Sequence, residues 1–328
     1  MGIYLVTGGA GFIGSHLAEA LAGRGHAVRV LDNLSTGSPA NLEPVRDRVQ
    51  FLGGDVTDRA AVEAAMHGVE VVFHQAALAS VPRSVADPLA THRACVDGTL
   101  HVLLAARDAG VRRVVYAASS SAYGNSARLP KSEADPTAPL SPYAVAKLAG
   151  EQYCAAFSTV YGLETVRLRY FNVFGPRQTP DSPYAAVIPL FIQALTAGRS
   201  PVLHGDGQQS RDFTFVADVV QANLLAAEAP GVSGRVYNVA CGRRSTLLEL
   251  VAHLNELLGT RIAPTHADPR PGDVRHSQAD ISRAVADLGY RPTTDMRQGL
   301  ARCLEWWRQR EGKREGRAAC GLARAPHR

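Results

Sequence analysis

The sequence predicts an α/β protein with a doubly wound parallel sheet, the Rossmann arrangement. In its first half, short runs rich in Val, Ile and Leu alternate with longer segments that carry apolar residues at i, i+3 and i+4. This alternation favours parallel strands joined by right-handed helical crossovers. The expected strands are Ile3–Thr7, Ala27–Asp32, Val49–Gly53, Val69–His74, Val111–Ser119 and Glu164–Phe171, and the expected helices are Phe12–Arg24, Asp58–His67, Ala86–Ala109 and Pro142–Tyr161.

The second half predicts a smaller, discontinuous domain that covers the first. Five prolines interrupt the pattern after Phe174, so short pieces are expected there. The next expected elements are a helix at Phe215–Glu228, a strand at Arg235–Ala240, and helices at Leu247–Leu258 and Thr294–Gln309. We expect a Rossmann domain of residues 1–172 and 206–240, a substrate domain of residues 173–205 and 241–308, and a mobile basic tail of residues 309–328.

Composition excludes several classes of protein. The formal net charge is +5, but the segment from Arg308 to Arg328 holds seven Lys/Arg and two Glu, so the tail carries the whole excess. We therefore expect no nucleic-acid partner, although a contact between the tail and an acidic partner stays open. No apolar run is long enough to span a membrane and no leader segment is recognised. The five cysteines are scattered without a CxxC pair, which indicates no metal site and favours the cytoplasm.

A glycine-rich turn after the first strand indicates a dinucleotide site. Gly8, Gly11 and Gly14 have the spacing GxxGxxG between a predicted strand and a predicted helix. Glycine lets the backbone approach a pyrophosphate closely, and the helix N-terminus offers free N–H groups to the phosphates. The alternative is a plain Gly-rich turn, which the flanking strand and helix disfavour.

Asp32 indicates that the dinucleotide is NAD. It ends the second strand, where an acidic residue grips the 2′-hydroxyl of the adenosine ribose. A carboxylate there repels the 2′-phosphate of NADP, and no arginine immediately follows. The alternative reading is that Asp32 caps the following turn. Asp55 and Val56, after the third strand, are expected near the adenine.

Tyr143 and Lys147 form a candidate catalytic pair. The spacing i, i+4 near the start of a helix places both side chains on one face. A nearby ammonium, together with a nicotinamide cation, is expected to lower the pKa of the phenol so that it can act as a base. Ser119, in the triplet Ser119–Ser121 after the fifth strand, can relay a proton. A YxxxK alone is common, and the triplet alone could be ordinary loop chemistry.

Together these elements resemble the extended short-chain dehydrogenase/reductase family. Five further segments narrow the resemblance to its nucleotide-sugar epimerases and dehydratases, and within them to UDP-glucose and UDP-N-acetylglucosamine 4-epimerases. These segments are Phe73–Ala77, Ala118–Gly124, Arg169–Gly175, Gly207–Phe213 and Arg270–Asp273. The resemblance runs from Ile3 to about Trp307 and implies an NAD-dependent isomerase that inverts carbon 4 of a UDP-sugar, usually as a homodimer through Ala86–Ala109 and Pro142–Tyr161.

The resemblance assigns roles to individual positions. Ser119, Tyr143 and Lys147 are the catalytic trio, and the diphosphate of the substrate is held by Asn172, Arg211 and Arg270. The implied cofactor residues are Gly8, Gly11, Phe12, Ile13, Gly14, Asp32, Asn33, Ser35, Thr36, Gly37, Asp55, Val56, Gln75, Ala76, Ala77, Tyr143, Lys147 and Tyr170. The other implied substrate residues are Ser80, Ser120, Ser121, Gln178, Ala186, Val187, Ile188, Phe213, Asp273 and Ser277, of which residues 186–188 and Phe213 lie near the uracil.

The serine triplet separates this chain from related chemistries. Family 4,6-dehydratases carry an Asp-Glu pair where Ser120 and Ser121 stand, and UDP-glucuronate decarboxylases carry Glu at position 121. Serine cannot replace these acids and bases. Small Ser277 at the sugar gate favours N-acetylated sugars as well, whereas the Ala79 methyl could narrow the site. A UDP-glucuronate 4-epimerase, an NAD-binding sensor without turnover and a net oxidoreductase stay open as alternatives.

Overall fold

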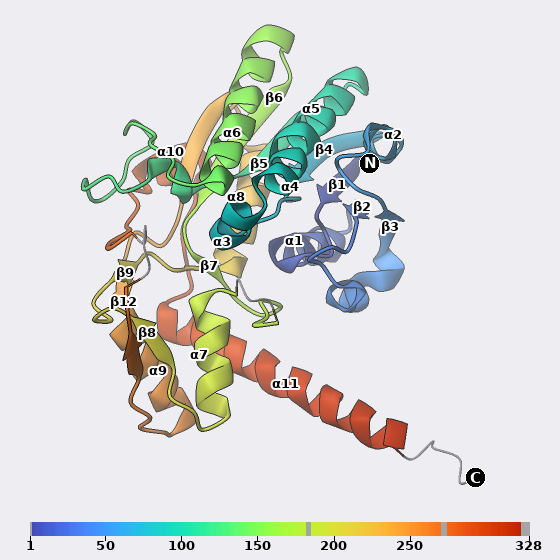
Figure 1. Ribbon diagram of the computed structural model, residues 1–328. Helices are drawn as coiled ribbons and strands as arrows, with labels where there is room; N and C mark the ends of the chain where they lie inside the picture. Colours follow the sequence, from blue (N-terminus) through green and yellow to red (C-terminus); the bar gives the residue numbers. More distant parts are fainter. Residues whose placement is uncertain (1, 182–184, 270–273, 323–328) are drawn as a thin grey trace.

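A seven-stranded parallel sheet forms the centre of the protein (Figure 1). The computed structural model describes residues 2–181, 185–269 and 274–322. The strands lie in the order β11-β6-β5-β4-β1-β2-β3, and the direction in which they are added reverses between β1 and β4. Their bounds are β1 Ile3–Thr7, β2 Ala27–Asp32, β3 Val49–Gly53, β4 Val69–His74, β5 Arg113–Ser119, β6 Glu164–Tyr170 and β11 Arg235–Val239. The predicted doubly wound sheet is therefore confirmed.

Helices cover both faces of this sheet. Alternate residues of a strand point to opposite faces, so Val6 joins one hydrophobic core and Leu5 the other. The core around Val6 also takes in α1 (Phe12–Gly23) and α8 (Val216–Glu228), whereas that around Leu5 contains residues of α2 (Arg59–Ala65), α5 (Gly98–Asp108) and α6 (Pro142–Tyr161). A 3₁₀ segment, η1 (Pro39–Arg48), connects β2 to β3.

The helix expected at Ala86–Ala109 is present and runs without a gap from Pro88 to Asp108. It consists of α4 (Pro88–His92), a π-helical turn at Arg93–Asp97 and α5. A separate short helix, α3 (Val81–Ala86), precedes it. Pro88 explains why a new helix starts here, because a proline has no N–H to continue the preceding helix and suits the first turn of the next one. Asp87 caps α4 by accepting a hydrogen bond from Ala90 N at 2.9 Å.

A second, smaller layer lies beyond the carboxyl ends of the strands. Its core joins α7 (Val187–Thr196), α9 (Leu247–Leu258) and α11 (Met296–Leu322). Three two-stranded sheets stand apart from the central sheet: β7 (Val173–Phe174) with β10 (Thr214–Phe215), β9 (Ser210–Arg211) with β12 (Ser245–Thr246), and β8 (Val202–His204) with β13 (Thr265–Ala267). Helix α7 was not expected from the sequence, but its Pro189 lies in the first turn, where proline is tolerated.

Two domain boundaries differ from those expected. Ala284 and Leu288 of α10 (Ser282–Leu288), and Tyr290 after it, belong to the sheet core rather than to the substrate domain. The chain therefore returns to the first domain once more within the range 241–308. Helix α11 continues to Leu322 instead of ending at Gln309, so the segment 309–322 is helical (Figure 1). No helix in the described part of the chain is long and apolar enough to cross a membrane.

A buried ion pair connects helix α6 to the sheet. Glu151 accepts two hydrogen bonds from Arg169 of β6, at 2.6 and 2.9 Å, and both side chains are almost fully buried. Removal of one partner leaves an uncompensated charge in the interior.

We predict that Glu151→Ala lowers the free energy of unfolding by about 3–5 kcal/mol in urea titrations, because Arg169 loses its counter-ion. The control is Glu63→Ala, which removes the exposed pair with Arg59 on α2 and should change stability by less than ~0.5 kcal/mol. Equal, small effects of the two variants would contradict the prediction.

Candidate active site

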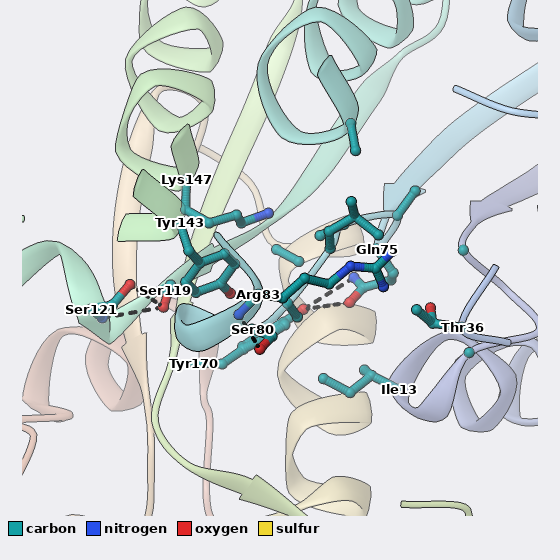
Figure 2. A pocket seen from close by; sticks show the side chains of 18 of the residues that line it. Ile13, Thr36, Gln75, Ser80, Arg83, Ser119, Ser121, Tyr143, Lys147 and Tyr170 are labelled. Carbon is teal, nitrogen blue, oxygen red and sulfur yellow. Dashed lines mark hydrogen bonds between the residues drawn. The ribbon is translucent and has the colours of Figure 1, made fainter. Parts of the chain in front are cut away.

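One large cavity opens at the carboxyl ends of β1, β4 and β5, where the strand order reverses. Its volume is ≈ 1080 Å³. The cavity brings together residues that are far apart in sequence, from the glycine turn to Ser277; Figure 2 shows part of its lining, from Ile13 to Tyr170. The predicted site residues that line it are Gly8, Gly11, Phe12, Ile13, Gly14, Asp32, Asn33, Ser35, Thr36, Asp55, Val56, Gln75, Ala76, Ala77, Ser80, Ser119, Ser120, Ser121, Tyr143, Lys147, Tyr170, Asn172, Gln178, Arg211 and Ser277.

The glycine turn has the shape that a dinucleotide requires. Gly8 has φ +67°, and a Cβ on it would lie 2.7 Å from Ala76 N. A Cβ on Gly14 would lie 2.2 Å from Gly8 O, so neither position accepts a side chain without displacing backbone. Gly11 is the N-cap of α1 and provides no side-chain cap, which leaves first-turn N–H groups free for phosphate oxygens. These residues fit the diphosphate of NAD.

Asp32 performs a structural task as well as lining the cavity. Its carboxylate accepts hydrogen bonds from Ala10 N at 2.9 Å and from Leu34 N at 2.7 Å. The carboxylate thus ties the glycine turn to the end of β2 and caps the following turn, as the alternative reading expected. Each carboxylate oxygen has a second lone pair, so a ribose hydroxyl can still be accepted there.

Tyr143, Lys147 and Ser119 meet at one wall of the cavity (Figure 2). Helix α6 carries Tyr143 and Lys147 one turn apart, and Ser141 fixes its start by accepting a hydrogen bond from Ala144 N at 3.2 Å. Ser119 ends β5, and its Oγ lies 2.8 Å from Ser121 Oγ. A phenol, an ammonium and two hydroxyls therefore border the same space.

The pKa of Tyr143 differs from the sequence-based expectation. Burial raises the pKa of the phenol, the Cys95 thiol adds to this rise, and a hydrogen bond with Ser119 opposes it. In the protein chain alone the loss of hydration therefore raises this pKa, and the expected lowering, which also requires the nicotinamide cation, stays a prediction.

Polar residues that follow the first domain's strands also line the cavity. Arg211 of β9 and Ser277 belong to its lining, and Ser277 N donates to Ser210 O at 3.0 Å. Asn172, with φ +36°, donates from Nδ2 to Asp212 O at 3.2 Å. Gln178 donates to Val173 O and leaves its Oε1 buried without a partner in the described part of the chain. Cationic and amide groups thus border the same cavity as the glycine turn.

Several predicted residues do not line the cavity. Gly37 packs under the glycine turn, where a Cβ would lie 2.8 Å from the Ala10 carbonyl carbon. The side chains of Ile188 and Phe213 are buried in the core of the second layer, and their expected place near the uracil stays a prediction. Ala186 and Val187 stand at the start of α7, outside the cavity wall. Arg270 and Asp273 lie outside the described residues, and their roles stay predictions.

The structure adds two cations that the sequence gave no reason to select. Lys131 lines the cavity and is 2% exposed, and its Nζ donates to Gly124 O at 3.2 Å. Arg93, on the π-helical turn, also lines the cavity. Both reach the site through non-local packing, which leaves no spacing signal. No cluster of His, Cys, Asp and Glu suitable for a metal occurs among the described residues, so the expectation of no metal site is not contradicted.

Comparisons with known proteins agree with this site. The family described as NAD dependent epimerase/dehydratase matches residues 4–240. UDP-glucose 4-epimerase from Mycolicibacterium smegmatis is 40% identical over 310 residues, which cover 93% of this chain and 98% of that protein.

Two solved structures extend the likeness to the whole fold. UDP-N-acetylglucosamine 4-epimerase from Methanobrevibacter ruminantium M1, in complex with UDP-N-acetylmuramic acid, has a TM-score of 0.90 and 41% identity, with 94% of this chain and 99% of that chain covered. UDP-glucose 4-epimerase from Thermotoga maritima, with UDP-glucose, has a TM-score of 0.90 and 37% identity over the same shares. The resemblance seen in the sequence is therefore confirmed, and the chain belongs to the NAD-dependent epimerase/dehydratase family.

Proposed function

We propose that this protein is a UDP-sugar 4-epimerase that interconverts UDP-glucose and UDP-galactose, and also UDP-N-acetylglucosamine and UDP-N-acetylgalactosamine. The observation that carries this proposal is that one cavity joins the glycine turn, the Ser119/Tyr143/Lys147 group and the polar wall at Arg211 and Ser277. A cofactor and a nucleotide sugar can thus meet at the tyrosine. The volume of ≈ 1080 Å³ lies at the upper end of the range for ligand pockets, as two ligands require.

Each residue group has a separate task in this reaction. Arg211 binds the diphosphate of UDP, which puts most of the binding energy on the part of the substrate that does not react. Tyr143 takes the proton of the 4-hydroxyl, either directly or through Ser119. A bound NAD, which the residues of the glycine turn and Asp32 would hold, would supply the hydride acceptor and donor for carbon 4. Because the sugar is held loosely, the 4-keto sugar can present its other face before reduction, and Tyr143 then returns the proton to the 4-oxygen.

The polar groups near the tyrosine favour epimerisation over other family reactions. Ser119, Ser120 and Ser121 line the cavity and offer hydroxyls only. Elimination of water across carbons 5 and 6 needs an acid and a base, and serine is neither at neutral pH. The presence of Tyr143 in the cavity also argues against a sensor without turnover, because binding alone has no use for a buried phenol.

The small side chain of Ser277 supports acceptance of N-acetylated sugars. Ser277 lines the cavity without a bulky side chain, and Ala79, which also lines it, narrows it by no more than a methyl group. Space for an acetamido group is therefore expected. UDP-glucuronate remains the alternative substrate, because the cavity also contains the cations Arg83 and Lys131.

We further propose that the protein is a homodimer, as the family resemblance implies, and that it resides in the cytoplasm, which the scattered cysteines favour. Helices α4 and α6 expose large apolar side chains, among them Leu89, Val145 and Val160. Exposed apolar groups on adjacent helices are typical of a surface that packs against a partner.

An NMR time course tests the reaction itself. Purified protein without added NAD is incubated in turn with UDP-glucose, UDP-N-acetylglucosamine and UDP-glucuronate. We expect 4-epimers of the first two, since an epimerase regenerates its NAD and retains it through many turnovers. Loss of activity unless NAD is added in proportion to product, with a ketosugar released, would identify a net oxidoreductase instead.

The role of Tyr143 is tested by Tyr143→Phe. Turnover should fall by about 10²–10⁴-fold, because the proton acceptor is lost, whereas NAD content and UDP affinity should stay unchanged. Tyr161→Phe, at the exposed end of the same helix, is the matched control and should retain wild-type kinetics. A near wild-type rate for Tyr143→Phe would show that another group is the base.

The role of Ser277 is tested by Ser277→Tyr. A large side chain at this wall should reduce kcat/KM for UDP-N-acetylglucosamine by more than ~100-fold relative to UDP-glucose, because the acetamido group loses its space. Ser277→Ala, which keeps the wall small, should preserve the ratio of the two substrates. If both variants leave the ratio unaltered, the acetamido group does not lie against Ser277.

A further inference from the structure

The ammonium of Lys147 lies over an aromatic ring. Lys147 is 3% exposed, and its Nζ is 4.3 Å from the centre of the Tyr116 ring. In the described part of the chain, no hydrogen bond or ion pair to this Nζ is found within the usual distance limits. Burial lowers the pKa of Lys147, since the charged form loses hydration. A contact that stabilises the charged form opposes this lowering.

The ring of Tyr116 is fixed in place. Tyr116 is fully buried on β5, and its hydroxyl donates to the main-chain oxygen of Lys147 at 3.2 Å. The His74 ring packs beside it at 5.7 Å. A Cβ on Gly150 would lie 2.3 Å from the Tyr116 hydroxyl oxygen, so the glycine of α6 makes room for this contact. The ring therefore presents a fixed face to the lysine.

The other titratable groups around Lys147 do not provide a free anion. Glu151, one turn further along α6, is bound by both arms of Arg169. Burial lowers the pKa of His74 to about 3 and raises that of the Cys154 thiol to about 12, so both are neutral at physiological pH. Cys95 is a buried thiol on the π-helical turn, and Tyr143 is a buried phenol whose pKa burial also raises. The charge of Glu151 still raises the pKa of Lys147, and the π face of Tyr116 adds a direct contact with the ammonium.

We propose that Tyr116 is a positioning residue whose aromatic face holds the charged side chain of Lys147 in the cavity. The proposal rests on the catalytic role of Lys147 in the proposed function. A ring face attracts a cation through its quadrupole, and the attraction is strongest where both groups are desolvated. Held there, the ammonium keeps its proton, stabilises the Tyr143 phenolate and donates to the nicotinamide ribose of NAD. Hydrophobic packing alone would predict that any apolar side chain of similar size serves as well.

The protonation state of Lys147 can be measured directly, because the chain contains only three lysines. Full-length protein is labelled with [¹³C]lysine, and the Cε–Hε signals are followed by NMR from pH 6 to 11. Lys131→Arg and Lys313→Arg assign the other two signals. The variants are Tyr116→Phe, which keeps the ring, and Tyr116→Leu, which removes it. The matched control is Tyr290→Leu, because Tyr290 is also fully buried and also donates to a main-chain oxygen, of Ala240 at 3.0 Å.

We expect the Lys147 signal of Tyr116→Leu to titrate about one pH unit lower than in the wild type, because a cation–π contact that stabilised the charged form is lost. Tyr116→Phe and Tyr290→Leu should titrate as the wild type does. An unchanged titration in Tyr116→Leu, or an equal shift in Tyr116→Phe or Tyr290→Leu, overturns the proposal. A wild type that shows the expected titrations but no epimerase activity would refute the proposed function and leave this inference standing.

Activity and cofactor binding provide a second readout. Tyr116→Leu should lose about tenfold to thirtyfold in kcat, with KM for the UDP-sugar nearly unchanged, and the fall of kcat at high pH should begin about one unit earlier. Its NAD should also dissociate several-fold faster. If Tyr116→Leu does not fold, phenylalanine with one, two or three ring fluorines at position 116 replaces it. Fluorination weakens the quadrupole at nearly constant shape, so the Lys147 titration should shift progressively, and a constant titration across the series overturns the proposal.

Discussion

The close backbone approach at the glycine turn is the constraint on which the rest of the site depends. Gly8 touches the backbone after β4, and Gly14 touches the carbonyl of Gly8, so α1 begins directly against two neighbouring strands. Any side chain at these positions would push α1 away from the point where the strand order reverses. Because the turn stays tight, Asp32 reaches Ala10 N, and the free N–H groups of α1 face the same cavity as the end of β5.

Helix α6 carries charged and ionisable side chains into the interior, where they need stabilising contacts. Its Glu151 is neutralised by Arg169, its Gly150 makes room for Tyr116, and its Lys147 rests on the ring of that tyrosine. Burial raises the pKa of Tyr143, so the protein chain alone does not make this phenol a base. For Tyr143 to act as a base, nearby cations must lower its pKa. The need for a protonated Lys147 thus connects the packing of β5 with the chemistry of the tyrosine.

The second layer completes a site that the first layer only begins. Its residues Arg211 and Ser277 line the same cavity as the glycine turn, whereas its apolar side chains, such as Ile188 and Phe213, build a separate core. This separation of polar lining residues from core residues suits a 4-epimerase. The nucleotide can be held firmly at the polar wall while the sugar, near Tyr143, keeps the freedom to present either face.

The sequence by itself determined which segments form the parallel strands, that a dinucleotide site follows the first of them, and that the cofactor is NAD; it also predicts the catalytic trio. These follow from local patterns: alternating periodicity, glycines at fixed spacing and a tyrosine four residues before a lysine. Only the tertiary structure decided the order of the strands in the sheet, that α10 returns to the sheet core, that Phe213 is buried in the core of the second layer, and that Lys131 and Arg93 border the cavity. It also decided that burial raises the pKa of Tyr143 and that the ammonium of Lys147 lies over the ring of Tyr116. Burial and contacts between distant segments set these features, and neither leaves a periodic signal in the chain.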